Sequence, residues 1–258
     1  MNYIEQMDFL KNTSLEDKKI YYKGDLDLLQ RRKVSIVGSR KPTSYARNLT
    51  FDLASRLAKS GFVVVSGGAI GIDAVAHKAA GAENTIMVAA TGLDMRYPAV
   101  NKKLIEEIEQ KGLVLSQFEE GVRSRAYHFP LRNELTVALG EVLIVSYADL
   151  KSGSMHSVEY AKKQGKKIYV LPHRLGESEG TNALLAAKEA EAIYDIEEFV
   201  IGIAGEQRAA RKRVEDEFLN FCKNRPTYEE AQLRFGAKLF EYELAGKVVV
   251  KEGRVFLA

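Results

Sequence analysis

The chain of 258 residues contains a single cysteine, Cys222. One cysteine excludes an internal disulfide framework and every cysteine-rich metal site, and the four histidines lack the spacing of metal ligands. The first residues contain no apolar core of secretory length, and the longest apolar runs are no longer than strands, so neither a signal peptide nor a membrane span is indicated. We therefore expect a cytoplasmic protein without a metal site.

An excess of charge of one sign is also missing. Lysine and arginine number 38 against 35 aspartates and glutamates, which gives a formal net charge of +3. So small an excess does not by itself indicate nucleic-acid binding. Basic residues form short groups, for example at residues 31–33 and 40–41, but groups of this size are usually solvated surface.

Apolar runs alternate with helical patterns from residue 33 onward. The runs are nearly continuous in Val, Ile and Leu, which is typical of parallel strands buried on both faces. They lie at residues 34–38, 62–68, 85–92, 113–118, 141–148, 167–172 and 192–195. Helical patterns fill the intervals at residues 44–60, 71–80, 101–111, 132–140, 154–164 and 181–190. This alternation predicts a doubly wound, Rossmann-like parallel α/β sheet within residues 1–205.

The pattern changes in residues 206–258. Three short helical segments and a terminal β-hairpin are indicated there, which is the composition of a winged helix. A wing that binds DNA bases should be basic, yet this region holds 11 Lys and Arg against 9 Asp and Glu. Glu241 and Glu243 lie in the third helix, where they would repel phosphates. We therefore interpret residues 206–258 as a protein-contacting or structural domain rather than one that recognises bases.

Glycine-rich turns follow the first two strands, but neither matches a cofactor motif. The first turn, VGSRKPTS, has one glycine, and the glycines of SGGAIG do not have the G-x-G-x-x-G spacing. No P-loop lysine follows either turn, so triphosphate hydrolysis has no machinery. Ser66, Ser152 and Ser154 lie in no nucleophile-elbow pattern and are better explained as helix caps or as donors to an anion. We expect no cofactor and no catalytic residues.

Four turns after predicted strands resemble one another: GSRKPTS (38–44), SGGAIG (66–71), ATGLD (90–94) and SGSMHS (152–157). In a parallel α/β sheet such turns all lie at the carboxyl edge, where small residues and helix N-termini present amide groups to anions. Arg40 and Lys41 add positive charge to the first turn. A row of such turns predicts a long groove for phosphates, and a polynucleotide backbone fits that shape.

An aromatic and cationic segment, YHFPLRNEL at residues 127–135, follows the fourth predicted strand, residues 113–118. Phe129 or Tyr127 could stack on a base, which is worth about 1–3 kcal/mol in single-strand binders. The alternative is that Phe129 packs under its own loop. The sequence leaves both open.

At these residues the chain resembles the DNA-processing protein A family (DprA, also called Smf). The shared motifs run in order through YYKGDLDLL, VSIVGSRKPTSYA, VVSGGAIGIDAVAH, TGLDMRYP, FPLRN, DLKSGSMHSVEYAKKQGK and LPHRLGESEGTNALL. The resemblance implies a non-catalytic protein that binds single-stranded DNA entering the cell in natural transformation, shields it and helps to load the RecA recombinase. It also implies a homodimer, with DNA across the glycine-rich edge of the Rossmann domain.

The resemblance assigns the DNA contacts to individual residues. It implies phosphate contacts, backbone approach or base contacts at Arg40, Lys41, Ser66, Gly67, Gly68, Gly71, Arg125, Phe129, Arg132, Asn133, Ser152, Gly153 and Ser154. The chain departs from the family at Glu134, where arginine is usual and where the acid would weaken the local positive field, and at His173, where glycine is usual. The region before the Rossmann domain is short, so we expect the helical domain found there in many members to be missing.

Two alternatives remain. One is an enzyme that processes nucleoside monophosphates on a related Rossmann core, for which Glu159 is the carboxylate near SGSMHS. Its place two turns into a helix predicts that it faces solvent instead. The other is a regulator that binds double-stranded DNA through the winged helix, against which Glu241 and Glu243 argue.

Overall fold

The computed structural model describes residues 2–5, 7, 10–11 and 13–257, except for the side chains of residues 206–216. The chain divides into two compact units, Met1–Val200 and Ile201–Ala258, called here the N-terminal and C-terminal units. The sequence predicts this boundary between residues 205 and 206. None of the helices in the described part of the chain is long and apolar enough to cross a membrane.

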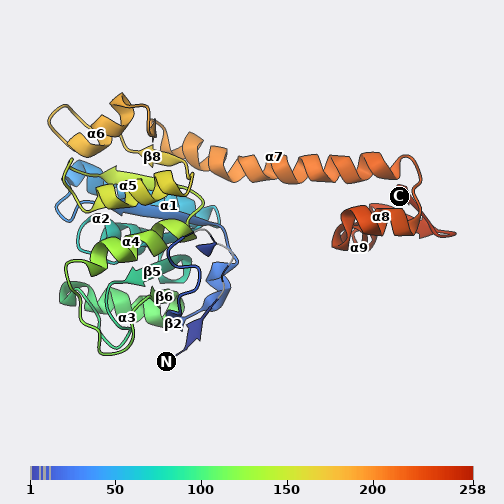
Figure 1. Ribbon diagram of the computed structural model, residues 1–258. Coiled ribbons are helices and arrows are strands. Elements are labelled where there is room, and N and C mark those ends of the chain that lie inside the picture. Colours follow the sequence, from blue (N-terminus) through green and yellow to red (C-terminus); the bar gives the residue numbers. More distant parts are fainter. Residues whose placement is uncertain (1, 6, 8–9, 12, 258) are drawn as a thin grey trace. The chain divides into compact units, whose positions relative to one another are not determined.

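The N-terminal unit is built on a nine-stranded sheet (Figure 1). Its order is β1-β2-β6-β5-β4-β3-β7-β8-β9, with parallel pairing from β6 through β9 and antiparallel pairing of β1 and β2 at one edge. The strands are β1 (Tyr3–Ile4), β2 (Ile20–Gly24), β3 (Lys33–Gly38), β4 (Val63–Ser66), β5 (Thr85–Ala89), β6 (Leu113–Ser116), β7 (Leu143–Tyr147), β8 (Ile168–Val170) and β9 (Glu191–Ala192). The predicted doubly wound α/β fold is confirmed.

Helices connect the strands at nearly the predicted positions. They are α1 (Ser44–Lys59), α2 (Ile72–Ala80), α3 (Lys102–Lys111), α4 (His128–Leu139), α5 (Ser154–Lys163) and α6 (Glu179–Ala186), with short 3-10 turns at Leu26–Leu29, Ala82–Asn84 and Ala99–Asn101. Helix α4 begins four residues before the predicted start at 132, because Pro130 falls in its first turn, where the helix does not use the missing N–H.

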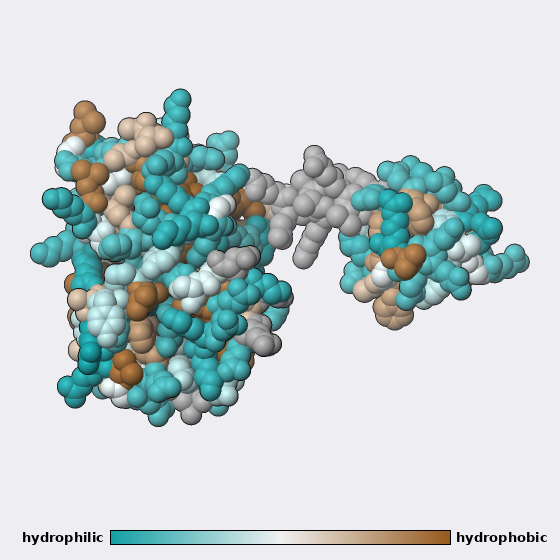
Figure 2. Space-filling view, in the orientation of Figure 1, coloured by the Kyte–Doolittle hydropathy of each residue, from teal (hydrophilic) through white to brown (hydrophobic). Residues whose placement is uncertain are grey.

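Both faces of the sheet are covered by helices (Figure 1). Strand β5 shows how: Met87 and Ala89 pack with residues of α2 and α3, whereas Ile86 and Val88 pack with α4. Successive side chains of a strand point to opposite faces, so a run of four apolar residues buries both. The visible surface of this unit is mostly hydrophilic, with apolar side chains in small separate groups (Figure 2).

Strand β3 stands at the point where the chain reverses its direction of winding. From β3 the order proceeds through β4, β5 and β6 on one side and through β7, β8 and β9 on the other. In open parallel sheets the crevice outside the carboxyl ends of the strands at such a switch point is where ligands bind. The turns that follow β3, β4 and β7 border this crevice.

The C-terminal unit has its own core. Helix α7 (Ile196–Cys222) leads into α8 (Tyr228–Phe235), α9 (Ala237–Leu244) and the hairpin β10 (Val248–Lys251) and β11 (Arg254–Leu257). One cluster of buried residues forms this core: Phe218, Cys222, Ala231, Leu239, Tyr242, Val248 and Val255. The hairpin and the last two predicted short helices are present, whereas the first predicted segment is the end of the 27-residue helix α7 and not a short helix. The assignment to a winged helix stays a prediction.

Candidate nucleic-acid interface

A cavity of about 610 Å³ lies at the switch point, and we call it the large cavity. Its walls are the turns after β3, β4 and β7 and the starts of α4 and α5. The structure brings nine of the predicted contact residues into its lining: Arg40, Lys41, Gly67, Phe129, Arg132, Asn133, Ser152, Gly153 and Ser154. These residues come from four separate stretches of the chain, so the sheet topology assembles the site.

Four predicted contact residues do not line the large cavity. Ser66 is fully buried and its hydroxyl donates to the carbonyl of Ile36 at 2.6 Å, so its side chain is part of the sheet core. Gly68 and Gly71 have positive φ values of 70° and 86°. Arg125 is exposed just before α4.

Gly71 is required by packing between two turns. A Cβ atom there would collide with the Ser39 carbonyl and the Arg40 Cα, and its φ of 86° is one that other residues rarely adopt. The close approach lets the Ile72 N–H donate to the Ser39 carbonyl at 3.1 Å. The glycine therefore allows the turns after β3 and β4 to pack against each other.

Two amides next to the predicted Gly67, Gly68 and Gly71 already have partners within the protein. The Ile72 N–H donates to Ser39, and the Ala69 N–H donates to Oδ2 of Asp73 at 3.3 Å. Asp73 is buried in the first turn of α2, the usual place for a bound anion. The protein thus supplies its own carboxylate at this helix N-terminus.

Arg132 forms the floor of the large cavity. It is 5% exposed, and its Nη1 donates to the carbonyls of Gly67 and Val88, the latter at 2.8 Å. Burial lowers the pKa of Arg132 and raises the pKa of Asp73, and the attraction between the two charges opposes both shifts. Arg132 is therefore a buried cation of the lining, and its contact with DNA stays a prediction. Arg40 and Lys41 are exposed cations of the same lining.

A smaller pocket adjoins the large cavity and shares Arg40, Gly67, Ala69, Phe129 and Arg132 with it. Its other lining residues are Ile70, Ala90, Tyr97 and Pro98. Phe129 packs against Tyr97 with ring centroids 6.0 Å apart, and the Arg40 guanidinium lies 5.0 Å from the centroid of the Phe129 ring. The aromatic ring thus contacts a different loop and carries a cation beside it.

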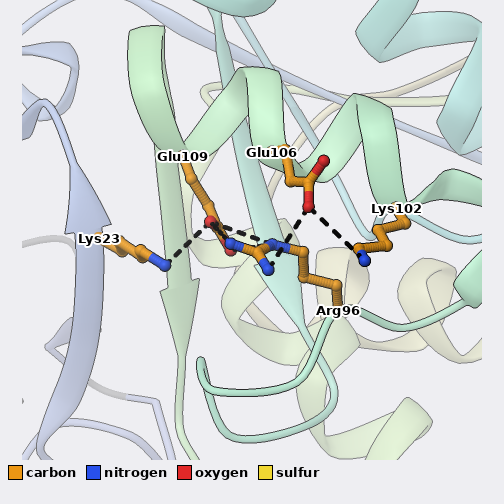
Figure 3. A network of polar contacts seen from close by, with 5 residues as sticks. All are labelled: Lys23, Arg96, Lys102, Glu106 and Glu109. Carbon is orange, nitrogen blue, oxygen red and sulfur yellow. Dashed lines mark hydrogen bonds and ion pairs between the residues drawn. The ribbon is translucent and has the colours of Figure 1, made fainter.

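Sequence reasoning missed Tyr97, although it lies in the motif TGLDMRYP directly after β5. An ion-pair network holds its loop (Figure 3). Arg96 donates to Glu109 of α3 at 2.6 Å, and Lys23 of β2 lies 2.9 Å from the same carboxylate. Glu106 accepts a longer contact from Arg96 at 3.6 Å. The network ties the loop to α3 and the edge of the sheet.

The ATGLD segment is not a tight strand-to-helix turn, which corrects the prediction. Helix α3 begins at Lys102, well beyond the segment, and Asp94 accepts from the N–H of Gly121 at 3.1 Å. Of residues 90–94, only Ala90 lines either cavity. The predicted row of four turns therefore reduces to three.

The two departures from the family pattern have structural explanations. Glu134 is buried and accepts from the N–H and hydroxyl of Ser14, at 2.9 and 2.5 Å, so it anchors the N-terminal segment instead of facing the large cavity. Its effect on the field in the site stays a prediction. His173 lies against the Tyr147 ring, and its Nε2 is 2.7 Å from the Ser146 carbonyl.

The carboxylate considered for an enzyme lies outside the site. Glu159 pairs with Lys162 at 3.5 Å and its side chain is 62% exposed. The acids that do line the large cavity are Asp73, which faces Arg132, and Asp149, which is exposed. Within the described residues, no group of three His, Cys, Asp or Glu side chains is placed to hold a metal ion.

The fold and this site together define a Rossmann-like α/β protein with a cationic, partly aromatic cavity at the topological switch point. The sequence profile of the DNA recombination-mediator protein A family matches residues 2–204. The chain belongs to this family.

Related proteins agree with this assignment. DNA processing protein DprA of Streptococcus pneumoniae is 38% identical over 170 residues, covering 64% of this chain and 60% of that protein. Protein Smf of a Synechocystis species is 38% identical over 160 residues, or 60% of this chain and 40% of that protein. DprA of Bacillus subtilis is 33% identical over 183 residues, or 69% of this chain and 62% of that protein. The matched region spans less than two thirds of each relative.

Solved structures extend the likeness to three dimensions. DNA processing protein A from Helicobacter pylori, solved in a study of its single-stranded DNA binding mode, matches with a TM-score of 0.75 at 43% identity, covering 80% of this chain and 96% of that one. DprA from Streptococcus pneumoniae matches with a TM-score of 0.66 at 35% identity, covering 71% of this chain and 65% of that one.

Proposed function

We propose that this protein binds single-stranded DNA in the large cavity and acts without chemistry of its own. In this role it protects DNA that enters the cell in natural transformation and helps to load RecA, in the cytoplasm and as a homodimer. The observation that carries the binding proposal is the joining of Arg40, Lys41, Phe129 and the SGS turn in one cavity. Family membership and the DNA-binding relative from Helicobacter pylori support it.

The charges of the site favour a nucleic-acid backbone. Arg40 and Lys41 are exposed, come from the turn after β3 and stand above a buried third cation, Arg132. Phosphate contacts supply most of the affinity in such interfaces. The cavity is concave and ringed by loops, so an extended single strand enters it more easily than a rigid duplex does.

The aromatic part of the site favours unpaired bases. Phe129 and Tyr97 wall the smaller pocket beside the large cavity, and a base can stack on an aromatic ring only when it is unpaired. Arg40 lies near the Phe129 ring, so a base that stacks on that side displaces the guanidinium toward a phosphate. Double-stranded DNA is a second and weaker candidate ligand.

The two exposed cations of the site can be removed one at a time. We expect Arg40→Ala and Lys41→Ala each to weaken binding of an oligo-dT about tenfold, and to reduce the slope of log affinity against log salt by about 0.7 for each phosphate that the variant no longer neutralises. Fluorescence anisotropy at several salt concentrations measures both. Lys59→Ala, at the opposite end of α1, is the matched control and should behave as wild type. Unchanged affinity and salt slope in the first two variants would contradict the proposed site.

The absence of chemistry and the RecA role have their own tests. Incubation with AMP should release no adenine, since Glu159 is paired with Lys162 outside the cavity.

RecA assembly on an oligonucleotide should be faster with the protein than without it, and the Arg40→Ala variant should lose part of that increase in rate.

A further inference from the structure

The wall of the large cavity formed by α5 has hydrogen-bonding groups without partners. Ser157 is fully buried and lines the cavity, and its Oγ has no hydrogen-bond partner among the described residues. The Oγ of Ser152, on the same wall, is also buried and without a partner there. Buried hydroxyls are normally hydrogen-bonded, so two unpartnered ones on one wall point to a partner from outside the chain.

The backbone at the start of α5 adds two donors. The N–H groups of Met155 and His156 bond to carbonyls within the turn, at 3.0 and 3.3 Å. The preceding N–H groups of Gly153 and Ser154 find no acceptor in the described part of the chain, and α5 has no side-chain cap. The N-termini of α1 and α2 differ, because Thr43 caps the first and Asp73 occupies the second.

These donors suit an anion. The N-terminus of a helix carries a partial positive charge, and α5 is long enough for that charge to develop. Arg40 and Lys41 line the same cavity and add two full charges. Asp149 also lines it, but this residue is exposed.

We infer that the start of α5 is a site for a phosphate monoester, either the terminal phosphate of a DNA strand or that of a free mononucleotide. An internal phosphate of a strand has only two free oxygens, because the other two are esterified to sugars, and it carries a single negative charge. A terminal phosphate has three free oxygens and a charge of nearly −2 at neutral pH, which matches two hydroxyls and two amides. For the terminal phosphate of a DNA strand, the inference rests on the proposed function. For a free mononucleotide, it rests on the cavity alone.

The test compares oligo-dT of one length with a 5′-phosphate, a 3′-phosphate or no terminal phosphate. We expect wild-type protein to bind one of the phosphorylated strands about tenfold more tightly than the unphosphorylated strand. Ser157→Ala should reduce that ratio to near one and leave the affinity for the unphosphorylated strand unchanged. Ser60→Ala, at the exposed end of α1, is the control and should keep the wild-type ratio.

A second experiment tests the site without a DNA strand: calorimetry measures the binding of dTMP and of thymidine. Binding of dTMP but not of thymidine, competed by inorganic phosphate, supports the site even if no oligonucleotide binds, and that outcome would overturn only the proposed function. The opposite result is a protein that binds all three strands with equal affinity and gives no heat with dTMP. That result would overturn the inference and leave the proposed function intact.

Discussion

Arg132 lines the large cavity and is also held inside the sheet by hydrogen bonds. Its guanidinium joins the turn after β4 to the end of β5, and its charge faces Asp73 beneath the cavity. His77 lies in the same buried region, with its Nδ1 2.6 Å from the Thr85 hydroxyl. Burial, with the nearby charge of Arg132 adding to it, lowers the pKa of His77 to about 3. This histidine is therefore neutral in the folded protein at every moderate pH.

His77 should consequently lower the stability of the N-terminal unit as the pH is lowered. In the unfolded chain the pKa of His77 returns to about 6.5, so between about pH 3 and 6.5 the unfolded state binds a proton that the folded state does not. The free energy of unfolding therefore decreases as the pH drops below about 6.5, by at most about 1.4 kcal/mol per pH unit from this group. Urea unfolding between pH 7.5 and 5 measures the slope.

Two variants isolate the contribution of His77. His77→Gln should show a shallower slope than wild type, whatever its stability at neutral pH. His156→Gln, at an exposed position in the lining of the cavity, is the control and should keep the wild-type slope. Identical slopes for wild type and His77→Gln would contradict this assignment.

At the scale of elements, the loop between β5 and α3 depends on one carboxylate. The Glu109 side chain is 7% exposed and accepts from both Arg96 and Lys23, whereas that of Glu106 is 38% exposed with contacts of 3.6 and 4.0 Å (Figure 3). The loop carries Tyr97 and Pro98, which wall the smaller pocket. Its position thus connects the ion pairs to the aromatic part of the site.

Glu109→Gln should lower the free energy of unfolding by about 1–2 kcal/mol. Charge-assisted hydrogen bonds contribute about 1.5–3 kcal/mol, and the partial exposure of Arg96 and Lys23 reduces that value. Urea denaturation measures the change. Glu106→Gln is the matched control, for which we expect less than about 0.5 kcal/mol because exposed, longer ion pairs contribute little. Equal losses in the two variants would show that burial of Glu109 does not matter.

The sequence predicted the elements better than it predicted the roles of residues. Apolar runs such as VVVS in β4 specify parallel strands, because both faces must be buried. Strands β1 and β2 were missed because β1 has only two residues and β2, IYYKG, buries only its first two, so neither shows the continuous apolar run of the central strands. The burial of Arg132 and the anchoring of Glu134 by Ser14 depend on tertiary contacts, which leave no trace in a local pattern.

At the scale of the whole molecule, the two units have separate cores. The C-terminal unit buries Cys222, the sole cysteine of the chain, at 1% exposure, and burial raises the pKa of its thiol. A core as small as that of residues 201–258 rarely supplies more than about 3–5 kcal/mol of stability. The larger N-terminal unit buries a greater share of its surface. The two units should therefore unfold at different temperatures, the C-terminal unit first.

We expect two transitions in calorimetry, the first of which exposes the thiol. The rate at which a thiol reagent modifies Cys222 should rise through the first transition and not change further in the second. Phe218→Ala, which removes about 3–5 kcal/mol from this core, should abolish the first transition and leave the second in place. A single transition that shifts as a whole in Phe218→Ala would contradict the independence of the units.

The assembly of the large cavity from distant stretches also has a consequence for the growing chain. Its walls need the turn after β3, the turn after β4, the start of α4 and the start of α5, so the last wall is absent until synthesis has passed residue 157. Parallel sheets of this kind form from contacts that are far apart in the sequence and fold slowly. A ribosome-bound chain that ends before α5 therefore has no complete site, and capture of an oligonucleotide during translation would report when the sheet closes around its switch point.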